Sequence, residues 1–144
     1  MIEVLNATFR GAVGAMAMTG LRLFADHAGI IREAPPNRFA RKRGRGLFRR
    51  IPRDRRRPAV ELVHWTTGAL AGALFSVLPE SLRRRSWAGP VYGLLVWFGF
   101  DAVGAPALGL TDRGWPHGRE RAVFLVDHLL FGLVLTEMRV RPRE

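Results

Sequence analysis

The sequence of 144 residues contains no cysteine, which excludes a disulfide framework and a metal site built on thiolates. It also lacks the H-E-x-x-H spacing of zinc hydrolases, a phosphate-binding glycine loop and a recognisable nucleophile constellation. No basic residue precedes the apolar part of the first segment, MIEVLNATF, so we expect no cleaved signal peptide. These absences predict a protein with no catalytic residues, no metal and no cofactor, and we expect it not to be an enzyme.

Lysine is nearly absent, because Lys42 stands beside 22 arginines among the 23 basic residues. This skew is typical of GC-rich bacterial genomes and indicates a bacterial source. The formal net charge is +11, yet the basic residues are concentrated, and residues 32–57 hold 12 of them. The rest of the chain is strongly apolar, so the mean hydropathy of +0.02 averages two unlike populations.

Three apolar stretches lie at 59–78, 87–110 and 122–138, and short arginine-bearing joints separate them. A helix rises about 1.5 Å per residue and the hydrocarbon layer is about 30 Å thick, so roughly 20 residues cross it. The three stretches contain 20, 24 and 17 residues, which is the length of a bilayer crossing. The pattern therefore predicts an integral membrane protein.

A fourth crossing is predicted near the start of the chain, in a segment rich in small residues with Arg10 and Arg22 near its ends. Only 11 uncharged residues separate the two arginines. Each arginine can extend its aliphatic stem through the lipid boundary and place its guanidinium in water, so the segment is long enough to cross. An amphipathic helix lying on the membrane surface is the alternative.

The sequence thus predicts an all-α fold, an integral membrane four-helix bundle in a single domain that covers residues 1–144. The predicted elements are helices at 6–27, 59–78, 87–108 and 121–138, with one long basic loop at 32–57. Lysine and arginine mark the cytoplasmic flanks of membrane helices. Fifteen basic residues flank the side of the long loop and six flank the other side, so we predict a cytoplasmic loop and termini outside.

Small residues recur at the spacing that lets membrane helices approach closely. The second and third predicted helices each carry a G-x-x-x-G pair, and the fourth carries a further glycine. The predicted packing positions are Gly68, Gly72, Gly89, Gly93 and Gly132. These faces predict a compact bundle and are compatible with a homo-oligomer or a larger membrane complex.

The long loop contains the run RFARKRGRGLFRRIPRDRRR, whose charge is also compatible with nucleic acid. A cytoplasmic loop is expected to be basic, however, and anionic headgroups attract each basic residue near the surface by about 1 kcal/mol. We therefore expect a bilayer with anionic headgroups as the partner, and no nucleic acid. The residues assigned to headgroup contact are Arg41, Lys42, Arg43, Arg49, Arg50, Arg55, Arg56 and Arg57.

Ionisable residues inside the predicted helices fall at one level when the chain is folded back and forth across the membrane. They lie in the cytoplasmic half, and they are Asp26, His27, Glu61, His64, Asp101, Asp127 and His128. Charges inside a membrane are costly, usually face the interior and mark functional candidates. Three interpretations stay open: a structural network that includes Arg22, a proton or ion path, and a metal or haem site.

Five ordered blocks carry a resemblance to a known family. They are GAVGAMAMTGLRL, EAPPNRFARK, HWTTGALAGALFSVLPE, AGPVYGLLVWFGFDAVGAPALGL and DHLLFGLVLTE. With these blocks in this order, the chain resembles the YagU-like group of small bacterial inner-membrane proteins, a domain of unknown function with four predicted membrane helices. The resemblance implies four crossings, and it supplies no reaction, cofactor or substrate.

From these patterns we expect a small multi-pass protein of the bacterial plasma (inner) membrane that serves as an accessory or interaction subunit. The alternative is a minimal proton or ion conduit, or a metal- or haem-binding membrane protein, that uses the acid–histidine cluster.

Overall fold

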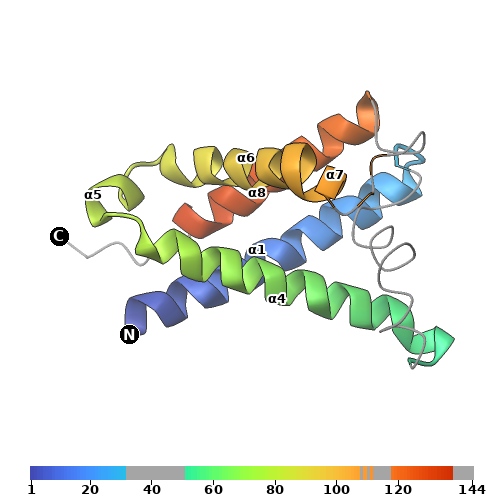
Figure 1. The fold of residues 1–144 in the computed structure, drawn as a ribbon, viewed down its shortest axis with the longest axis horizontal. Helices are drawn as coiled ribbons and strands as arrows, with labels where there is room; N and C mark the ends of the chain where they lie inside the picture. Colours follow the sequence, from blue (N-terminus) through green and yellow to red (C-terminus); the bar gives the residue numbers. More distant parts are fainter. Residues whose placement is uncertain (32–50, 108, 110, 112–117, 138–144) are drawn as a thin grey trace.

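The computed structural model describes residues 1–31, 51–107, 109, 111 and 118–137, and all regular secondary structure within them is helical (Figure 1). The long helices are α1 (Ile2–His27), α4 (Arg56–Val77), α6 (Ala88–Gly99) and α8 (Arg119–Glu137). Shorter elements are η1 (Arg53–Arg55), α5 (Glu80–Arg83), η2 (Phe100–Gly104) and α7 (Ala105–Ala107). The predicted all-α fold is therefore confirmed for the part of the chain that the structure describes.

Three of the long helices, α1, α4 and α8, begin before their predicted starts. α1 begins at Ile2, before the predicted start, because the intervening residues contain no glycine or proline that would break the helix. α4 begins at Arg56, and Pro58 does not prevent this because proline is tolerated in the first turn of a helix. Hydropathy therefore located the helices but not their polar ends. The predicted loop lies mostly outside the described residues, which resume at Ile51.

α1 ends in a turn that a left-handed glycine makes possible. Gly29 has φ +68°, a conformation that residues with a side chain rarely adopt. The chain then folds back, and the Ile30 backbone N–H donates to the Ala25 carbonyl at 2.9 Å. Ile31 is buried beside Ala25 and Phe124, so this turn ties the end of α1 to α8.

α6, η2 and α7 form one continuous helical path from Ala88 to Ala107, which widens into a π-helix over Phe100–Gly104. Pro106 follows this segment and has no backbone N–H, so the regular hydrogen-bond ladder cannot continue through it. π-helices are rare and occur mostly as single turns within α-helices, as here. The π segment contains Asp101, one of the predicted cluster residues.

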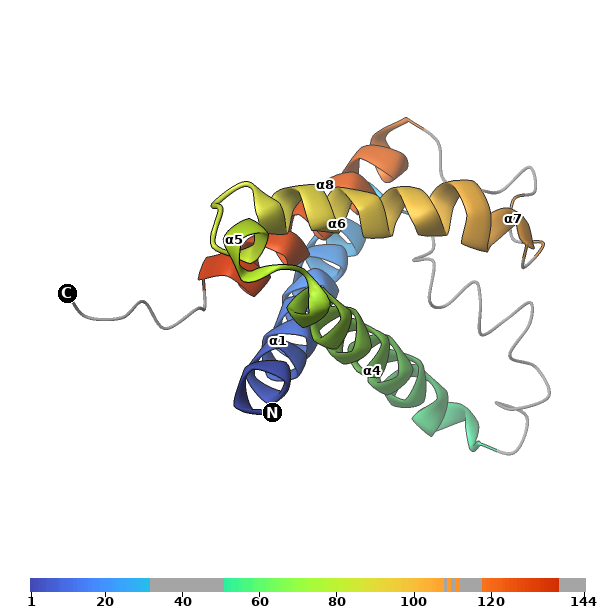
Figure 2. The same cartoon turned by 60° about the vertical axis from the view of Figure 1, so that its left-hand side comes forward.

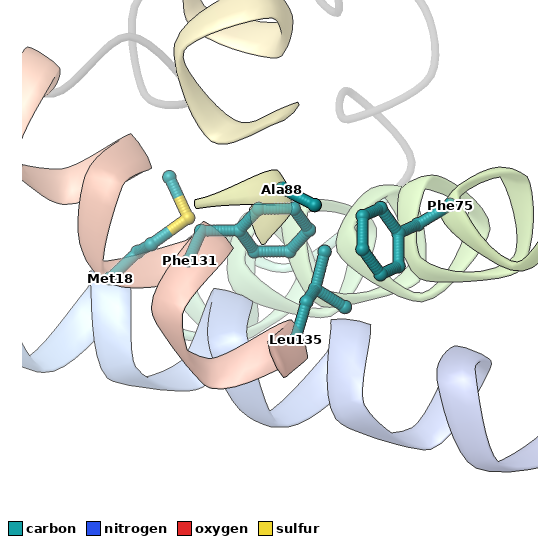
Figure 3. Close-up of a cluster of buried hydrophobic side chains, with 5 residues drawn as sticks. All are labelled: Met18, Phe75, Ala88, Phe131 and Leu135. Carbon is teal, nitrogen blue, oxygen red and sulfur yellow. The ribbon is translucent and has the colours of Figure 1, made fainter. Parts of the chain in front are cut away.

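α1 packs along α4 on one side and α8 on the other, and α6 packs along α8. α4 and α6 meet near α5 and diverge toward their other ends (Figure 2). An apolar core joins all four long helices through Met18, Phe75, Ala88, Phe131 and Leu135 (Figure 3). We call these five residues the apolar core.

The predicted packing glycines lie at two close helix crossings. In the crossing of α1 with α4, a Cβ atom added to Gly11 would lie 2.9 Å from the Cα atom of Gly72. In the crossing of α6 with α8, a Cβ atom added to Gly132 would lie 2.9 Å from the backbone nitrogen of Pro90. No real side chain fits at such distances. The remaining predicted positions, Gly68, Gly89 and Gly93, are buried at the same two crossings.

Among the described residues, two helical stretches are long and apolar enough to cross a membrane. They are Arg53–Val77 and Ala88–Ala107, which correspond to the second and third predicted crossings.

Candidate functional site

Arg22 lies at the centre of the polar interior, on the face of α1 that points between α4 and α8. Its side chain is only 5% exposed. One guanidinium nitrogen, Nη2, lies 3.5 Å from the Glu61 carboxylate of α4. Another, Nε, lies 3.7 Å from the Asp127 carboxylate of α8. The positive charge of one arginine on α1 therefore faces two negative carboxylates, one on α4 and one on α8, and so joins three helices.

The Thr19 hydroxyl completes the contact between α1 and α4. It accepts hydrogen bonds from Arg22 Nη2 at 3.0 Å and from the Trp65 indole at 3.1 Å. It lies 2.7 Å from a Glu61 oxygen, to which it donates. A hydroxyl has one proton and two lone pairs, so every hydrogen-bonding position of Thr19 is used. This saturated hydroxyl fixes Glu61 and Trp65 against α1.

Two buried polar atoms beside Arg22 have no hydrogen-bond partner among the described residues. They are Oδ1 of Asp127 and Nε2 of His64. Asp127 is only 1% exposed, and its other oxygen is the one that faces Arg22. Buried polar atoms in proteins are normally bonded, so two unfilled positions close to one arginine are unusual.

His128 adds a second imidazole to the same region. Its Nδ1 lies 2.7 Å from the Phe124 carbonyl one turn earlier in α8. Donation from Nδ1 to that carbonyl leaves the lone pair on Nε2. His64 lies within electrostatic range of both Arg22 and His128. We call Arg22, Glu61, His64, Asp127 and His128 the Arg22 cluster.

The other predicted cluster residues make contacts with groups outside the Arg22 cluster. Asp26 and His27 are exposed at the end of α1, where His27 Nδ1 lies 2.8 Å from the Leu23 carbonyl. Asp101 pairs with Arg121 of α8, and the Arg121 guanidinium also lies 5.4 Å from the centre of the Trp97 ring. α6 and α4 diverge toward this end of the molecule (Figure 2).

Of the arginines assigned to headgroup contact, three fall within the described residues. Arg55 and Arg57 are exposed at the start of α4, and Arg56 donates from Nε to the Ile51 carbonyl at 3.1 Å. The other five assigned residues, Arg41, Lys42, Arg43, Arg49 and Arg50, lie outside the described residues.

The sequence did not predict Thr19 or Trp65 as site residues, and it indicated Arg22 only as a possible member of a structural network. One signal was available: Glu61 and His64 are three residues apart, which places both on the same face of α4. Glu-x-x-His spacing occurs in helical di-iron proteins, where two such pairs act together with two further glutamates. No group of three or more possible metal ligands forms among the described residues.

Comparison with known protein families matches residues 1–142 to DUF6789, a family of unknown function. The match covers nearly the whole sequence, so the chain belongs to this family. No curated protein and no solved structure matches it. The resemblance to the YagU-like group stays a prediction, because the family that matches carries no link to that group.

Proposed function

We propose that this member of the DUF6789 family is a four-crossing protein of the bacterial plasma membrane that serves as an accessory or interaction subunit. The observation that carries the membrane assignment is the distribution of side chains. Large apolar residues are exposed on every long helix, while charged residues lie buried beside the apolar core. Lipid is the solvent that suits such a surface, because water would favour the opposite arrangement.

The outward apolar residues are large and numerous. Among those at least two-fifths exposed are Phe9 and Met16 on α1, Leu70 and Leu74 on α4, Leu95 and Phe98 on α6, and Val126 and Leu133 on α8. Within the described part of the chain, the buried polar residues are Arg10, Thr19, Arg22, Asp127 and Thr136. Large exposed apolar patches mark sites of contact with a membrane or with another protein.

The lengths of α1 and α8 support crossings in addition to the two apolar stretches. α1 has 26 residues and α8 has 19, which correspond to about 39 Å and about 28 Å. Each carries a charge inside the helix, Arg22 and Asp127. These two charges face one another, so each offsets part of the cost of burying the other in lipid.

Hydroxyl groups on the helix surfaces also suit a lipid environment. Thr66 and Thr67 are exposed on α4, and each hydroxyl donates to the carbonyl four residues earlier, at 2.8 and 2.9 Å. Thr8 on α1 donates in the same way, at 2.8 Å. A hydroxyl that faces lipid has no water to bond, so bonding back to its own helix satisfies it.

The proposed orientation places the diverging ends of α4 and α6 in the cytoplasm. Arginines gather there before α4 and at the start of α8, where Arg119 and Arg121 lie. The α5 end carries Arg83 and Arg84, which pair with Glu3 and Glu80. The Arg84 hydrogen bond lowers the pKa of the Glu80 carboxyl, which keeps this pair ionised. The orientation follows the larger number of basic residues on the side of the long loop.

The accessory role rests on the faces that the fold leaves open. The glycine pairs form contacts between helices of this chain, so a partner protein would bind to other surfaces. α4 packs along α1. α6 contacts α4 near α5, where the Tyr92 hydroxyl donates to the Ala71 carbonyl at 2.7 Å. The remaining apolar face of α4 is thus open to a helix of a second copy or of a larger complex.

Cysteine labelling in cells tests this proposal, because the native chain has no cysteine to interfere. We expect Ser86→Cys, beside α5, to react with a membrane-impermeant maleimide in intact cells. Asp54→Cys, in η1, should react only after the membrane is opened. Labelled protein in mild detergent should then migrate on a native gel well above the size of the 16.1 kDa monomer.

The reverse labelling pattern at both positions would contradict the orientation, and labelling of both in intact cells would contradict membrane crossing by the segments between them. Migration of all labelled protein as a monomer would contradict the accessory role and leave the topology intact.

A further inference from the structure

The Arg22 cluster is closed toward the α5 end of the molecule. Met18 lies one turn before Arg22 in α1, and Phe131 lies one turn after Asp127 in α8. Both directions lead toward α5, because Glu3 near the start of α1 pairs with Arg83 at the end of α5. Met18 and Phe131 belong to the apolar core, which is at least 96% buried (Figure 3). A dry layer therefore separates the cluster from this end.

The cluster is open in the opposite direction through Glu61. Its side chain is 26% exposed, whereas that of Asp127 is 2% exposed. Glu61 also belongs to the cluster, because it contacts both Thr19 and Arg22. One carboxylate thus touches the surroundings at the diverging ends of the helices and the buried arginine at the same time.

The bonding of the cluster is incomplete. The two Arg22 contacts, at 3.5 and 3.7 Å, are longer than the roughly 2.7–2.9 Å of charge-assisted hydrogen bonds. Oδ1 of Asp127 and Nε2 of His64 have no partner among the described residues. Two carboxylates face one guanidinium, so with both histidines neutral the cluster has one negative charge in excess. One added proton would make it neutral, which a buried site favours.

Among the described residues, no further charged group pairs with the cluster to offset this excess. On α1 and α4 the titratable or charged groups that face the site are Arg22, Glu61 and His64. On α8 they are Asp127 and His128. On α6, Tyr92 donates to the Ala71 carbonyl near α5, and Asp101, in the adjoining η2, pairs with Arg121.

From this geometry we infer that the Arg22 cluster binds one exchangeable proton on Asp127 and exchanges it with water only on the Glu61 side. In the binding step a hydronium ion breaks one O–H bond and leaves water, and the proton forms a bond to Asp127 Oδ1. The cluster changes from one excess negative charge to none. The protein thus holds a one-sided proton site and is not a through-channel. Proton binding itself is independent of the proposed function, and only the identity of the accessible side rests on it.

Infrared titration of the full chain in detergent micelles tests the proton site. As the pH falls, we expect the C=O stretch of one buried protonated carboxyl to appear reversibly in the wild type. It should be absent in Asp127→Asn and kept in Asp101→Asn, the matched control on the same end of the molecule. Loss of the signal only in Asp101→Asn, or a titration that sodium displaces at constant ionic strength, would overturn the inference.

Glu61→Gln keeps the test decisive if Asp127→Asn does not fold. This variant removes the excess negative charge, so the carboxyl signal should appear only at a lower pH than in the wild type, and hydrogen–deuterium exchange of the carboxyl should slow by about 100-fold, the lower range for a positioned proton-transfer group. An unchanged exchange rate would overturn the assigned route.

Proton flux into liposomes tests whether the site is one-sided. Liposomes with wild-type protein should be no leakier to protons than empty ones, because the apolar core blocks the second side. A flux that Asp127→Asn abolishes would overturn one-sidedness. Absence of the carboxyl signal together with the expected cysteine labelling would reject the proton site alone. Presence of the carboxyl signal together with the opposite labelling pattern would reject the proposed topology alone.

Discussion

Replacement of Arg22 by leucine is expected to destabilise the folded chain by about 3–5 kcal/mol, the usual cost of removing one partner from a buried ion pair. Asp127 would keep a carboxylate that is 1% exposed and would lose the cation 3.7 Å away. Glu61 would lose a partner as well, and Thr19 would lose one of its donors. Unfolding by denaturant in mild detergent, followed by circular dichroism, measures the effect.

The matched control is Arg84→Leu, because Arg84 is paired with a carboxylate but is 66% exposed. Exposed ion pairs contribute little, so this variant should unfold like the wild type. The double variant Arg22→Leu with Asp127→Leu should recover much of the lost stability, since no buried charge is left without a partner. Equal stability of Arg22→Leu and Arg84→Leu would contradict the central place given to Arg22.

Replacement of Gly93 by leucine is expected to separate α6 from α8 and to destabilise the chain by at least about 3 kcal/mol, the upper range for overpacking. A Cβ atom at this position would lie 3.0 Å from the His128 carbonyl carbon and closer still to its oxygen. Backbone atoms cannot rotate away as a side chain can, so the helices themselves must move apart. The same unfolding measurement applies.

Gly99→Leu is the control on the same helix, because a Cβ atom there meets nothing within 4 Å. It should leave stability close to that of the wild type, or raise it slightly, since glycine is a poor helix former. If the two variants were equally stable, close contact at Gly93 would not hold the two helices together.

The positions of the helices could be predicted because apolar length alone decides them. The stretch from residue 87 to the region of Pro106 is long enough to cross lipid and is almost free of charge, and the structure makes it helical from Ala88 to Ala107. The ends were harder to predict, because Ile2–Leu5 and Arg119 carry no signal that stops a helix. The π segment depends on how the chain relaxes before Pro106, which hydropathy does not report.

The candidate site could be predicted only in part, because periodicity gives the face of a helix but not the neighbour that it meets. Glycine spacing predicted close crossings, yet it did not pair Gly72 with Gly11 or Gly132 with Gly89. The same limit explains why Asp101 was predicted to join the cluster. Its predicted depth in the membrane matched that of Glu61, but α4 and α6 diverge at that end and Asp101 pairs with Arg121. The sequence predicted that the Arg22 guanidinium reaches water. Its place between two carboxylates depends on how the helices pack, which the sequence pattern does not give.

The central claim is that all four long helices cross a membrane with their large apolar side chains toward lipid. Spin labels on single cysteines test it most directly, at Met16, Leu70, Leu95 and Leu133, one position on each helix and each at least 44% exposed. In liposomes, all four labels should collide more often with dissolved oxygen, which concentrates in lipid, than with a water-soluble nickel chelate, and a label at Ser86 should show the reverse. Labels at Met16 and Leu133 that collide mainly with the nickel chelate would contradict the claim, because α1 and α8 would then lie in water.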